Sequence, residues 1–161
     1  MAQVLDVAEY IRRCLPALTT MKLQKLVYFS QAVHLVETGK PLFSAQIEAW
    51  VEGPVVRELF NEVRGKRSTP VLPGDPNRLA AVEVASITKT LEWYGDYSGE
   101  VLSEMTHADA PWRDGRNGLA PTQYGAVTIE PAAMLAFYSE LFTTIPDDLM
   151  SADEFAAAFL V

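Results

Sequence analysis

Apolar residues recur at spacings of three and four along most of the chain, which is the period of one face of an α-helix. Helices are predicted where this spacing lies between capping residues, prolines and glycines. The run QIEAWV, residues 46–51, fits either a short strand or one helical turn, and a second short strand is expected near residues 124–129. The predicted helices span about residues 3–14, 20–38, 54–63, 78–94, 98–105 and 131–142.

These elements predict a mainly α fold: one compact domain of about six helices with a minor, short β element. The length of 161 residues suffices for a single domain with a buried core. We expect this domain over residues 1–145 and a separate tail over 146–161. The prediction is sharpest for the second helix, where Thr19 or Thr20 provides an N-terminal cap and Gly39 a left-handed C-terminal cap.

The tail has an acidic beginning and an apolar end. Ser151 and Glu154 have the spacing of a capping box, which predicts a short terminal helix. Phe155, Phe159 and Leu160 share one face of that helix. Two interpretations remain open: the helix docks in a groove on a partner, or it packs on its own domain.

Composition narrows the function classes. Hydrophobic residues make up 49% and charged residues 21%, the balance of a globular protein. The net charge of -8 is unevenly distributed: residues 1–70 carry nine basic and seven acidic side chains, and residues 71–161 carry four and fourteen. The only basic cluster is the short run 64–67, interpreted as a solvated turn. We therefore expect no nucleic-acid partner; the acidic half favours a basic protein partner, or serves solubility.

Other features point to the cytoplasm. No apolar run approaches the ~20 residues of a membrane helix, so no membrane partner is expected. The N-terminal segment is amphipathic with early acidic residues, unlike a signal peptide. A single cysteine, Cys14, excludes an internal disulfide framework and is interpreted as a small hydrophobe. A homodimer remains open, although no heptad seam supports one.

Few residues are candidates for chemistry. His34 and Glu37 are spaced for one helical face, but two ligands make a weak metal site, and His34 is interpreted as a core histidine. His107 and Asp109 are close enough in sequence to orient one another in a general base, the alternative in which the protein is a small hydrolase or transferase. The competing interpretation gives His107 and Trp112 structural roles at a helix end. We expect no catalytic site, no metal and no cofactor.

A different set of side chains suits protein binding. Amphipathic residues lie mainly off the inward face of the second helix, and such residues are typical of partner surfaces. In the connector that follows, Phe43 and Trp50 are predicted to anchor the loop on the helical core, since burying one ring contributes about 2 kcal/mol. The candidate partner-binding residues are Lys22, Gln24, Lys25, Tyr28, Gln31 and Trp50.

Two stretches resemble the signature of a known family. MKLQKLVYFSQAVHLVETGKPLF with IEAWVEGPVVRELF, and later LSEMTHADAPW, are similar to the Panacea domain of SocA-like antitoxins from bacterial and phage toxin–antitoxin systems. The resemblance covers roughly residues 4–142, and Met21 stands where the family often has proline. The matching positions are Leu23, Gln24, Lys25, Leu26, Tyr28, Gly39, Pro41, Leu42, Phe43, Glu48, Ala49, Trp50, Gly53, Pro54, Val55, Leu102, Ser103, Thr106, His107, Pro111 and Trp112.

The resemblance implies an antitoxin rather than an enzyme. Members of this family neutralise a toxin encoded in the adjacent gene by direct protein–protein binding. The resemblance also implies a possible second mode, in which the antitoxin is an adaptor that delivers its toxin to a ClpXP-type protease. A third hypothesis is an autoregulatory antitoxin that binds its own promoter, but no helix-turn-helix on a basic surface supports it.

Overall fold

The computed structural model describes residues 1–144. The predicted terminal helix, with Phe155, Phe159 and Leu160, lies outside the described residues. Within them the fold is mainly α with a small sheet, as predicted. Its elements are α1 (Val4–Cys14), α2 (Thr20–Thr38), β1 (Ile47–Trp50), β2 (Gly53–Val56), α3 (Arg57–Val63), η1 (Pro76–Arg78), α4 (Ala81–Tyr94), α5 (Gly99–Ala108), α6 (Ala110–Arg116), β3 (Val127–Ile129), α7 (Pro131–Leu141) and η2 (Phe142–Thr144).

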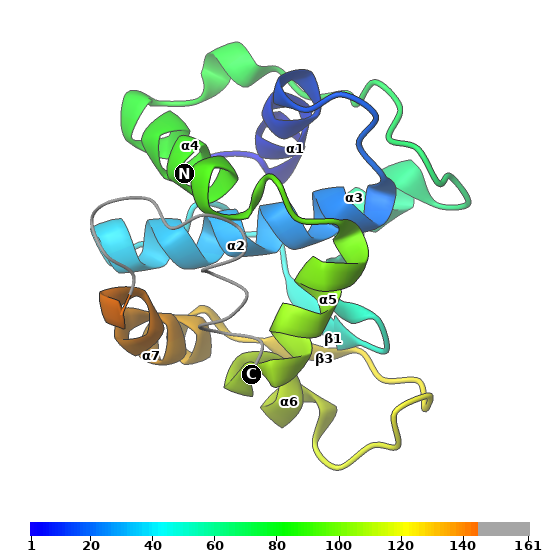
Figure 1. Cartoon of the computed structure of the whole chain (residues 1–161). Coiled ribbons are helices and arrows are strands. Elements are labelled where there is room, and N and C mark those ends of the chain that lie inside the picture. Colours follow the sequence, from blue (N-terminus) through cyan, green and yellow to red (C-terminus); the bar gives the residue numbers. More distant parts are fainter. Residues whose placement is uncertain (145–161) are drawn as a thin grey trace.

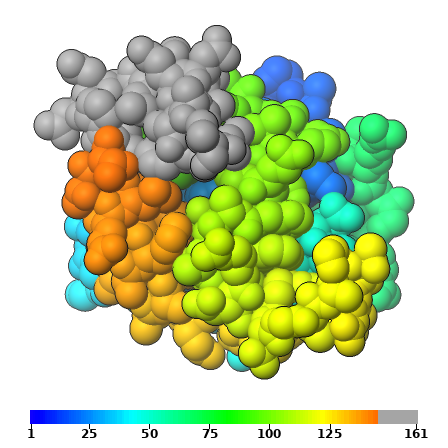
Figure 2. All heavy atoms as spheres, turned by 60° about the horizontal axis from the view of Figure 1, so that its bottom comes forward, coloured from blue at the N-terminus to red at the C-terminus, as the bar shows by residue number. Residues whose placement is uncertain are grey.

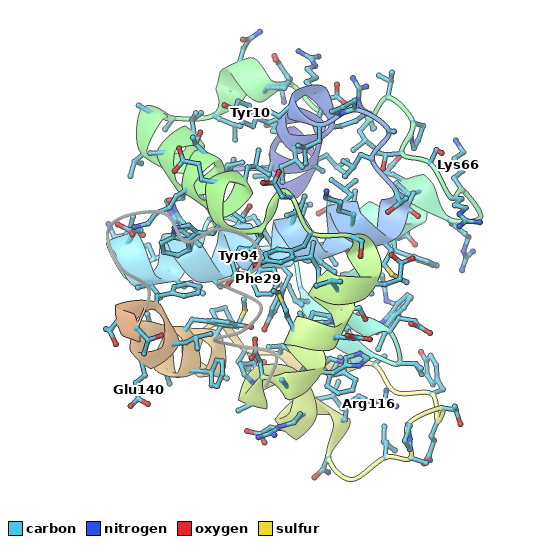
Figure 3. The ribbon with its side chains drawn as sticks, viewed as in Figure 1. Tyr10, Phe29, Lys66, Tyr94, Arg116 and Glu140 are labelled. Atoms are coloured by element: carbon cyan, nitrogen blue, oxygen red, sulfur yellow. The ribbon has the colours of Figure 1, made fainter. Side chains whose placement is uncertain are left out.

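Helix α2 runs through the middle of the molecule. In Figure 1, α1 and α4 lie on one side of it and α7 and the sheet on the other. A helix enclosed on all sides has no solvent face, and α2 accordingly carries few charged residues. Phe29 of α2 stacks on Tyr94 of α4, with ring centroids 4.0 Å apart, at the centre of the molecule (Figure 3). The caps of α2 are confirmed: Thr19 accepts from the Lys22 amide, and Gly39 has φ of +74°.

The connector after α2 forms a β-hairpin. Strand β1 is the central strand of an antiparallel sheet in the order β2-β1-β3, with Trp50 opposite Gly53 and Ile47 opposite Val56. The ambiguity over residues 46–51 is thus resolved as a strand. The prediction that Pro54 opens a helix is wrong: Pro54 lies in β2, and α3 begins at Arg57. Pairing with β1 outweighs the local preference of proline for a helix start.

Residues 108–128 lie outside the predicted helices, yet they are not irregular throughout. The short helix α6 lies within them, with Pro111 in its first turn. Its few apolar residues give no periodic signal, which is why the pattern missed it. The strand expected near 124–129 is confirmed as β3. Figure 2 shows the face where α5 and α6 lie beside α7, with the loop 117–126 at one edge.

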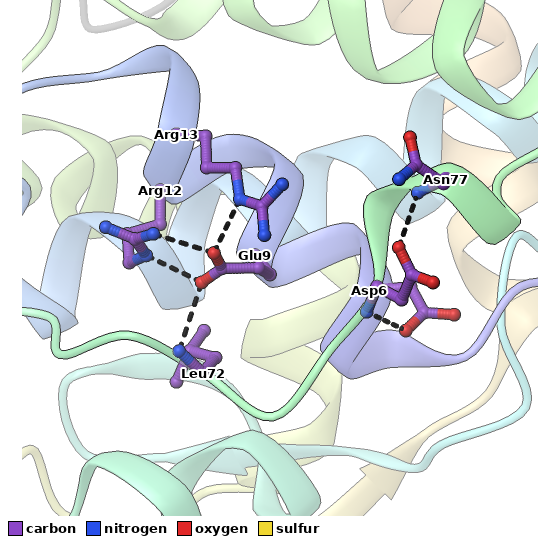
Figure 4. A network of polar contacts seen from close by, with 7 residues as sticks. Asp6, Glu9, Arg12, Arg13, Leu72 and Asn77 are labelled. Carbon is purple, nitrogen blue, oxygen red and sulfur yellow. Dashed lines mark hydrogen bonds and ion pairs between the residues drawn. The ribbon is translucent and has the colours of Figure 1, made fainter.

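Two carboxylates of α1 hold the loop that leads from α3 to α4 (Figure 4). Glu9 accepts hydrogen bonds from Arg12, from Arg13 and from the Leu72 amide at 3.0 Å. Asp6 accepts from the Asp75 amide at 2.7 Å. The proline-rich loop therefore lies along α1 even though it has little regular structure.

Among residues 1–144, none of the helices combines the length and the apolar character that crossing a membrane requires.

Candidate partner-binding site

A shallow apolar recess of about 240 Å³ opens at the N-terminal end of α2. Three further segments complete it: the β1–β2 hairpin, α3 and the loop that follows α3. We call it the Trp50 recess. Most of its exposed lining is apolar, which distinguishes it from an ordinary solvated groove. It is lined by Thr20, Met21, Gln24, Lys25, Trp50, Glu52, Val55, Phe60, Val63, Gly65 and Lys66.

Two aromatic rings form one wall of the Trp50 recess. Trp50 and Phe60 meet edge to face, with ring centroids 4.8 Å apart. A guanidinium group covers each ring: Arg57 lies 5.1 Å from the Trp50 centroid and Arg64 5.7 Å from that of Phe60. Cations at these distances are attracted by the ring faces, so the rings and the cations hold one another in place.

Polar contacts fix the orientation of Trp50. Its Nε1 donates to Glu48 at 2.9 Å, and its carbonyl oxygen accepts from Trp112 Nε1 at 2.7 Å. Glu48 also accepts a two-point hydrogen bond from Arg57, and this bond holds the pKa of Glu48 below its usual value. Trp50 is half-buried, and its ring lies against Phe60 and Arg57 rather than within the core. The anchoring of Trp50 on the helical core therefore stays a prediction.

Lys25 contributes to the lining although it is 1% exposed. Its Nζ donates to the Pro54 carbonyl oxygen at 2.9 Å. Gly53 packs against it with φ of +119°, and a Cβ there would lie 2.9 Å from Lys25 Cε. Burial lowers the pKa of Lys25 to about 7, opposed by the charge of Glu52. Gly53 and Pro54 therefore accommodate Lys25. Gly53 leaves room for its side chain, and the Pro54 carbonyl oxygen accepts its hydrogen bond.

Four of the six predicted partner residues are buried rather than outward-facing. Gln24, Lys25, Tyr28 and Gln31 are each 5% exposed or less, so the prediction that they lie off the inward face of α2 is wrong. The reason is that neighbouring elements enclose α2 on all sides. Lys22 is half-buried, and its Nζ donates to the Gly95 carbonyl oxygen at 2.6 Å.

The two glutamines act as clamps on neighbouring backbone. Gln24 accepts from the Val56 amide at 2.9 Å and donates to the Val56 carbonyl at 3.2 Å. Gln31 accepts from the Leu42 amide at 2.6 Å and donates to the Phe43 carbonyl at 3.0 Å. Of the six predicted residues, the Trp50 recess thus brings together Gln24, Lys25 and Trp50. Lys22, Tyr28 and Gln31 do not line it.

The remaining signature residues support the fold. Leu23, Leu26 and Phe43 are core residues at 1% exposed or less, and the anchoring role predicted for Phe43 agrees with this burial. Gly39 ends α2. The other signature positions, buried or partly buried, are Pro41, Val55, Pro111 and Trp112.

His107 and Asp109 do not orient one another. His107 stacks on Trp112, with ring centroids 4.0 Å apart, and its buried Nε2 has no hydrogen-bond partner among residues 1–144. Burial lowers the pKa of His107, and the charge of Lys25 lowers it further. Asp109 accepts from Tyr138 Oη at 2.7 Å, and burial raises its pKa to about 6. The pairing expected of a general base is therefore wrong for the described part of the chain.

His34 and Glu37 also have separate partners. His34 Nδ1 lies 2.8 Å from Ser86 Oγ in the interior, and Glu37 pairs with Lys89 at the surface. Cys14 is exposed rather than a buried small hydrophobe, so that interpretation is wrong.

Sequence reasoning missed two parts of the Trp50 recess. Phe60 has the helical spacing of a core residue, but it is half-buried and forms the wall. The basic run 64–67 is exposed, as a solvated turn would be, yet it lies at the rim. The spacing of Phe60 from Val63 and Arg64 does not reveal its partial exposure, because the same spacing suits a core residue.

The comparisons with known proteins give a family. The family model described as "Antitoxin SocA-like, Panacea domain" matches residues 23–113, which is more than half of the chain. No curated protein and no solved structure matches. The matched region begins in α2, ends in α6 and includes every residue that lines the Trp50 recess except Thr20 and Met21. The chain therefore belongs to the SocA-like antitoxin Panacea domain family.

Proposed function

We propose that the protein is an antitoxin that neutralises a cognate protein toxin, encoded in the adjacent gene, by direct binding. The Trp50 recess is the contact surface in this proposal. One observation carries it: an apolar recess with a half-buried Trp–Phe pair lies within the matched region of an antitoxin family. Half-buried aromatic rings with a polar rim are typical of the central residues of protein interfaces.

The proposal assigns distinct tasks to buried and exposed residues. Gln24, Lys25 and Gln31 hold the hairpin and the loop in place, and Trp50 and Phe60 contact the toxin. Residues 1–145 are the antitoxin domain in this account, and residues 146–161 are a tail. The protein acts in the cytoplasm without enzymatic activity, cofactor or membrane.

Co-expression with the protein of the adjacent gene tests the proposal. The neighbour is induced alone and then together with this chain, while growth and co-purification are followed. We expect arrest in the first case, and recovered growth with a purified complex in the second. A harmless neighbour that does not bind would contradict the proposal.

The same experiment separates the two antitoxin mechanisms. Growth that recovers with the neighbour still present and bound supports sequestration. Growth that recovers only in cells with a ClpXP-type protease, with loss of the neighbour, supports the adaptor mode.

A further inference from the structure

The loop that carries the cations beside the Trp50 recess is fixed by hydrogen bonds to its backbone. The loop 64–67 carries Arg64, Lys66 and Arg67, all exposed. Its backbone is fixed to the start of α2: Thr20 donates its amide to the Arg67 carbonyl at 2.9 Å and its hydroxyl to the Lys66 carbonyl at 2.8 Å. Figure 3 shows Lys66 at the outer edge of the molecule. The three cations are therefore presented on an anchored loop.

These three cations have no acidic partner in the described part of the chain. Arg57, by contrast, is paired with Glu48 at 2.8 Å. Arg64, Lys66 and Arg67 form no ion pair within residues 1–144. Glu52 is the one carboxylate in the lining of the Trp50 recess, and the buried Nζ of Lys25 in the same wall donates to the Pro54 carbonyl oxygen. The field at this surface thus favours an approaching negative charge.

We propose that the Trp50 recess recognises an acidic, apolar segment of the toxin. An apolar side chain of that segment packs on Trp50 and Phe60, and its carboxylates lie beside Arg64, Lys66 and Arg67. The inference rests on the proposed function and specifies its partner. The recess of about 240 Å³ is smaller than a typical small-molecule pocket, and it suits one or two side chains of a peptide.

The chemistry of the surface argues for a peptide rather than a nucleic acid. A nucleic-acid site needs a basic face that follows the phosphates over several nucleotides. Here the unpaired cations occupy one short loop beside an apolar surface, and the remainder of the chain is strongly acidic: residues 71–161 carry fourteen acidic and four basic side chains. Carboxylates spaced around an apolar side chain fit this geometry.

Three synthetic peptides of equal length test the inference on the full chain. The first carries Leu and Phe four residues apart, flanked by Glu; the second has Lys in place of Glu; the third keeps Glu but has Ser in place of Leu and Phe. We expect the first to bind at least about tenfold more tightly than either of the others at low salt. Its advantage over the Lys peptide should shrink at high salt, because the Debye length falls to about 3 Å at 1 M.

Substitutions in the protein test whether the acidic peptide binds at the Trp50 recess. Phe60→Ala and Lys66→Glu should each weaken binding of the acidic peptide by about threefold to tenfold. The matched controls are Val71→Ala, an exposed apolar residue outside the recess, and Lys40→Glu, beyond the far end of α2. The controls should bind as the unmodified chain does. Lys66 is exposed, so Lys66→Glu remains informative even if Phe60→Ala lowers stability.

The outcomes separate this inference from the proposed function. Equal binding of the Glu and Lys peptides, or insensitivity to Lys66→Glu, would overturn the acidic-segment inference. Preferential binding of a single-stranded oligonucleotide of matching charge, with competition at the recess, would also overturn it. The proposed function survives those results if the adjacent gene's protein still binds and is neutralised. It fails if that protein neither binds nor is toxic, whatever the peptides do.

Discussion

At the scale of single residues, two carboxyl groups have pKa values shifted in opposite directions. Glu9 is fully buried, but its bonds to Arg12, Arg13 and the Leu72 amide favour the ionised form. These bonds, led by that from Arg12, lower the pKa of Glu9 to about 2. Asp109 accepts from one tyrosine hydroxyl, and burial raises its pKa to about 6. The two groups therefore give opposite pH dependences of stability.

Glu9→Gln should lower the free energy of unfolding at neutral pH by roughly 2 kcal/mol, because the three part-buried hydrogen bonds from Arg12 and Arg13 lose their charged acceptor. The pKa of Glu9 is depressed in the folded state, so its contribution is present above the ordinary value of 4.5 and is lost as pH falls towards 2. Urea unfolding at several pH values measures this. The prediction is wrong if the two chains differ as much at pH 2 as at pH 7.

Asp109→Asn should stabilise the protein at pH 7, by up to about 3 kcal/mol for a shift of about two pKa units. The pKa of Asp109 is raised in the folded state, so stability falls as pH rises from 3.8 to about 6 and then levels off. The substitution removes that decline and leaves an oxygen to accept from Tyr138. Melting temperatures across this range test it. A lower melting temperature at pH 7 would contradict the account.

At the scale of elements, α2 explains both the success and the failure of sequence reasoning. Its caps at Thr19 and Gly39 are local features, so the ends of the helix were predictable. The orientation of Gln24 and Gln31 was not, because the backbone groups that they clamp lie in segments more than ten residues away. The scarcity of charge along the middle of α2 was the available signal that residues 23–35 are buried on every face.

The same reasoning explains the hairpin. Pro54 locally favours a helix start, and only the non-local pairing with β1 places it in a strand. Three residues of the Trp50 recess, Gln24, Lys25 and Trp50, were predicted from their amphipathic character, although Gln24 and Lys25 are buried. Phe60 and the cations of 64–67 depend on how α3 and its loop meet α2, which periodicity along one element does not reveal.

Gln31→Leu tests how much the hydrogen bonds of Gln31 to the backbone of Leu42 and Phe43 contribute to stability. The substitution leaves the Leu42 amide and the Phe43 carbonyl buried without partners, and we expect a loss of about 2–4 kcal/mol in unfolding free energy. The matched control is Gln46→Leu at an exposed position, where a change within about 0.5 kcal/mol is expected. Chemical denaturation compares the two. Equal stability of both variants would mean that the clamp contributes nothing.

At the scale of the whole molecule, the described residues contain a continuous core, with members from Val4 to Phe142. A chain ending at residue 144 should therefore keep its cooperative unfolding, with a change below about 1 kcal/mol. Calorimetry and binding of the adjacent gene's protein are measured on both lengths. Lost stability would favour a tail that packs on its own domain; lost binding alone would favour a tail that contacts the toxin. No change in either would contradict both interpretations of the tail.

The central claim is that the Trp50 recess binds the toxin. The most direct measurement is calorimetric titration of the adjacent gene's protein into the unmodified chain, into Phe60→Ala and into the control Val71→Ala, with melting temperatures taken on the same samples. The account predicts that Phe60→Ala weakens binding by about tenfold or more while remaining folded, and that Val71→Ala binds normally. Unchanged affinity in a folded Phe60→Ala chain would contradict it.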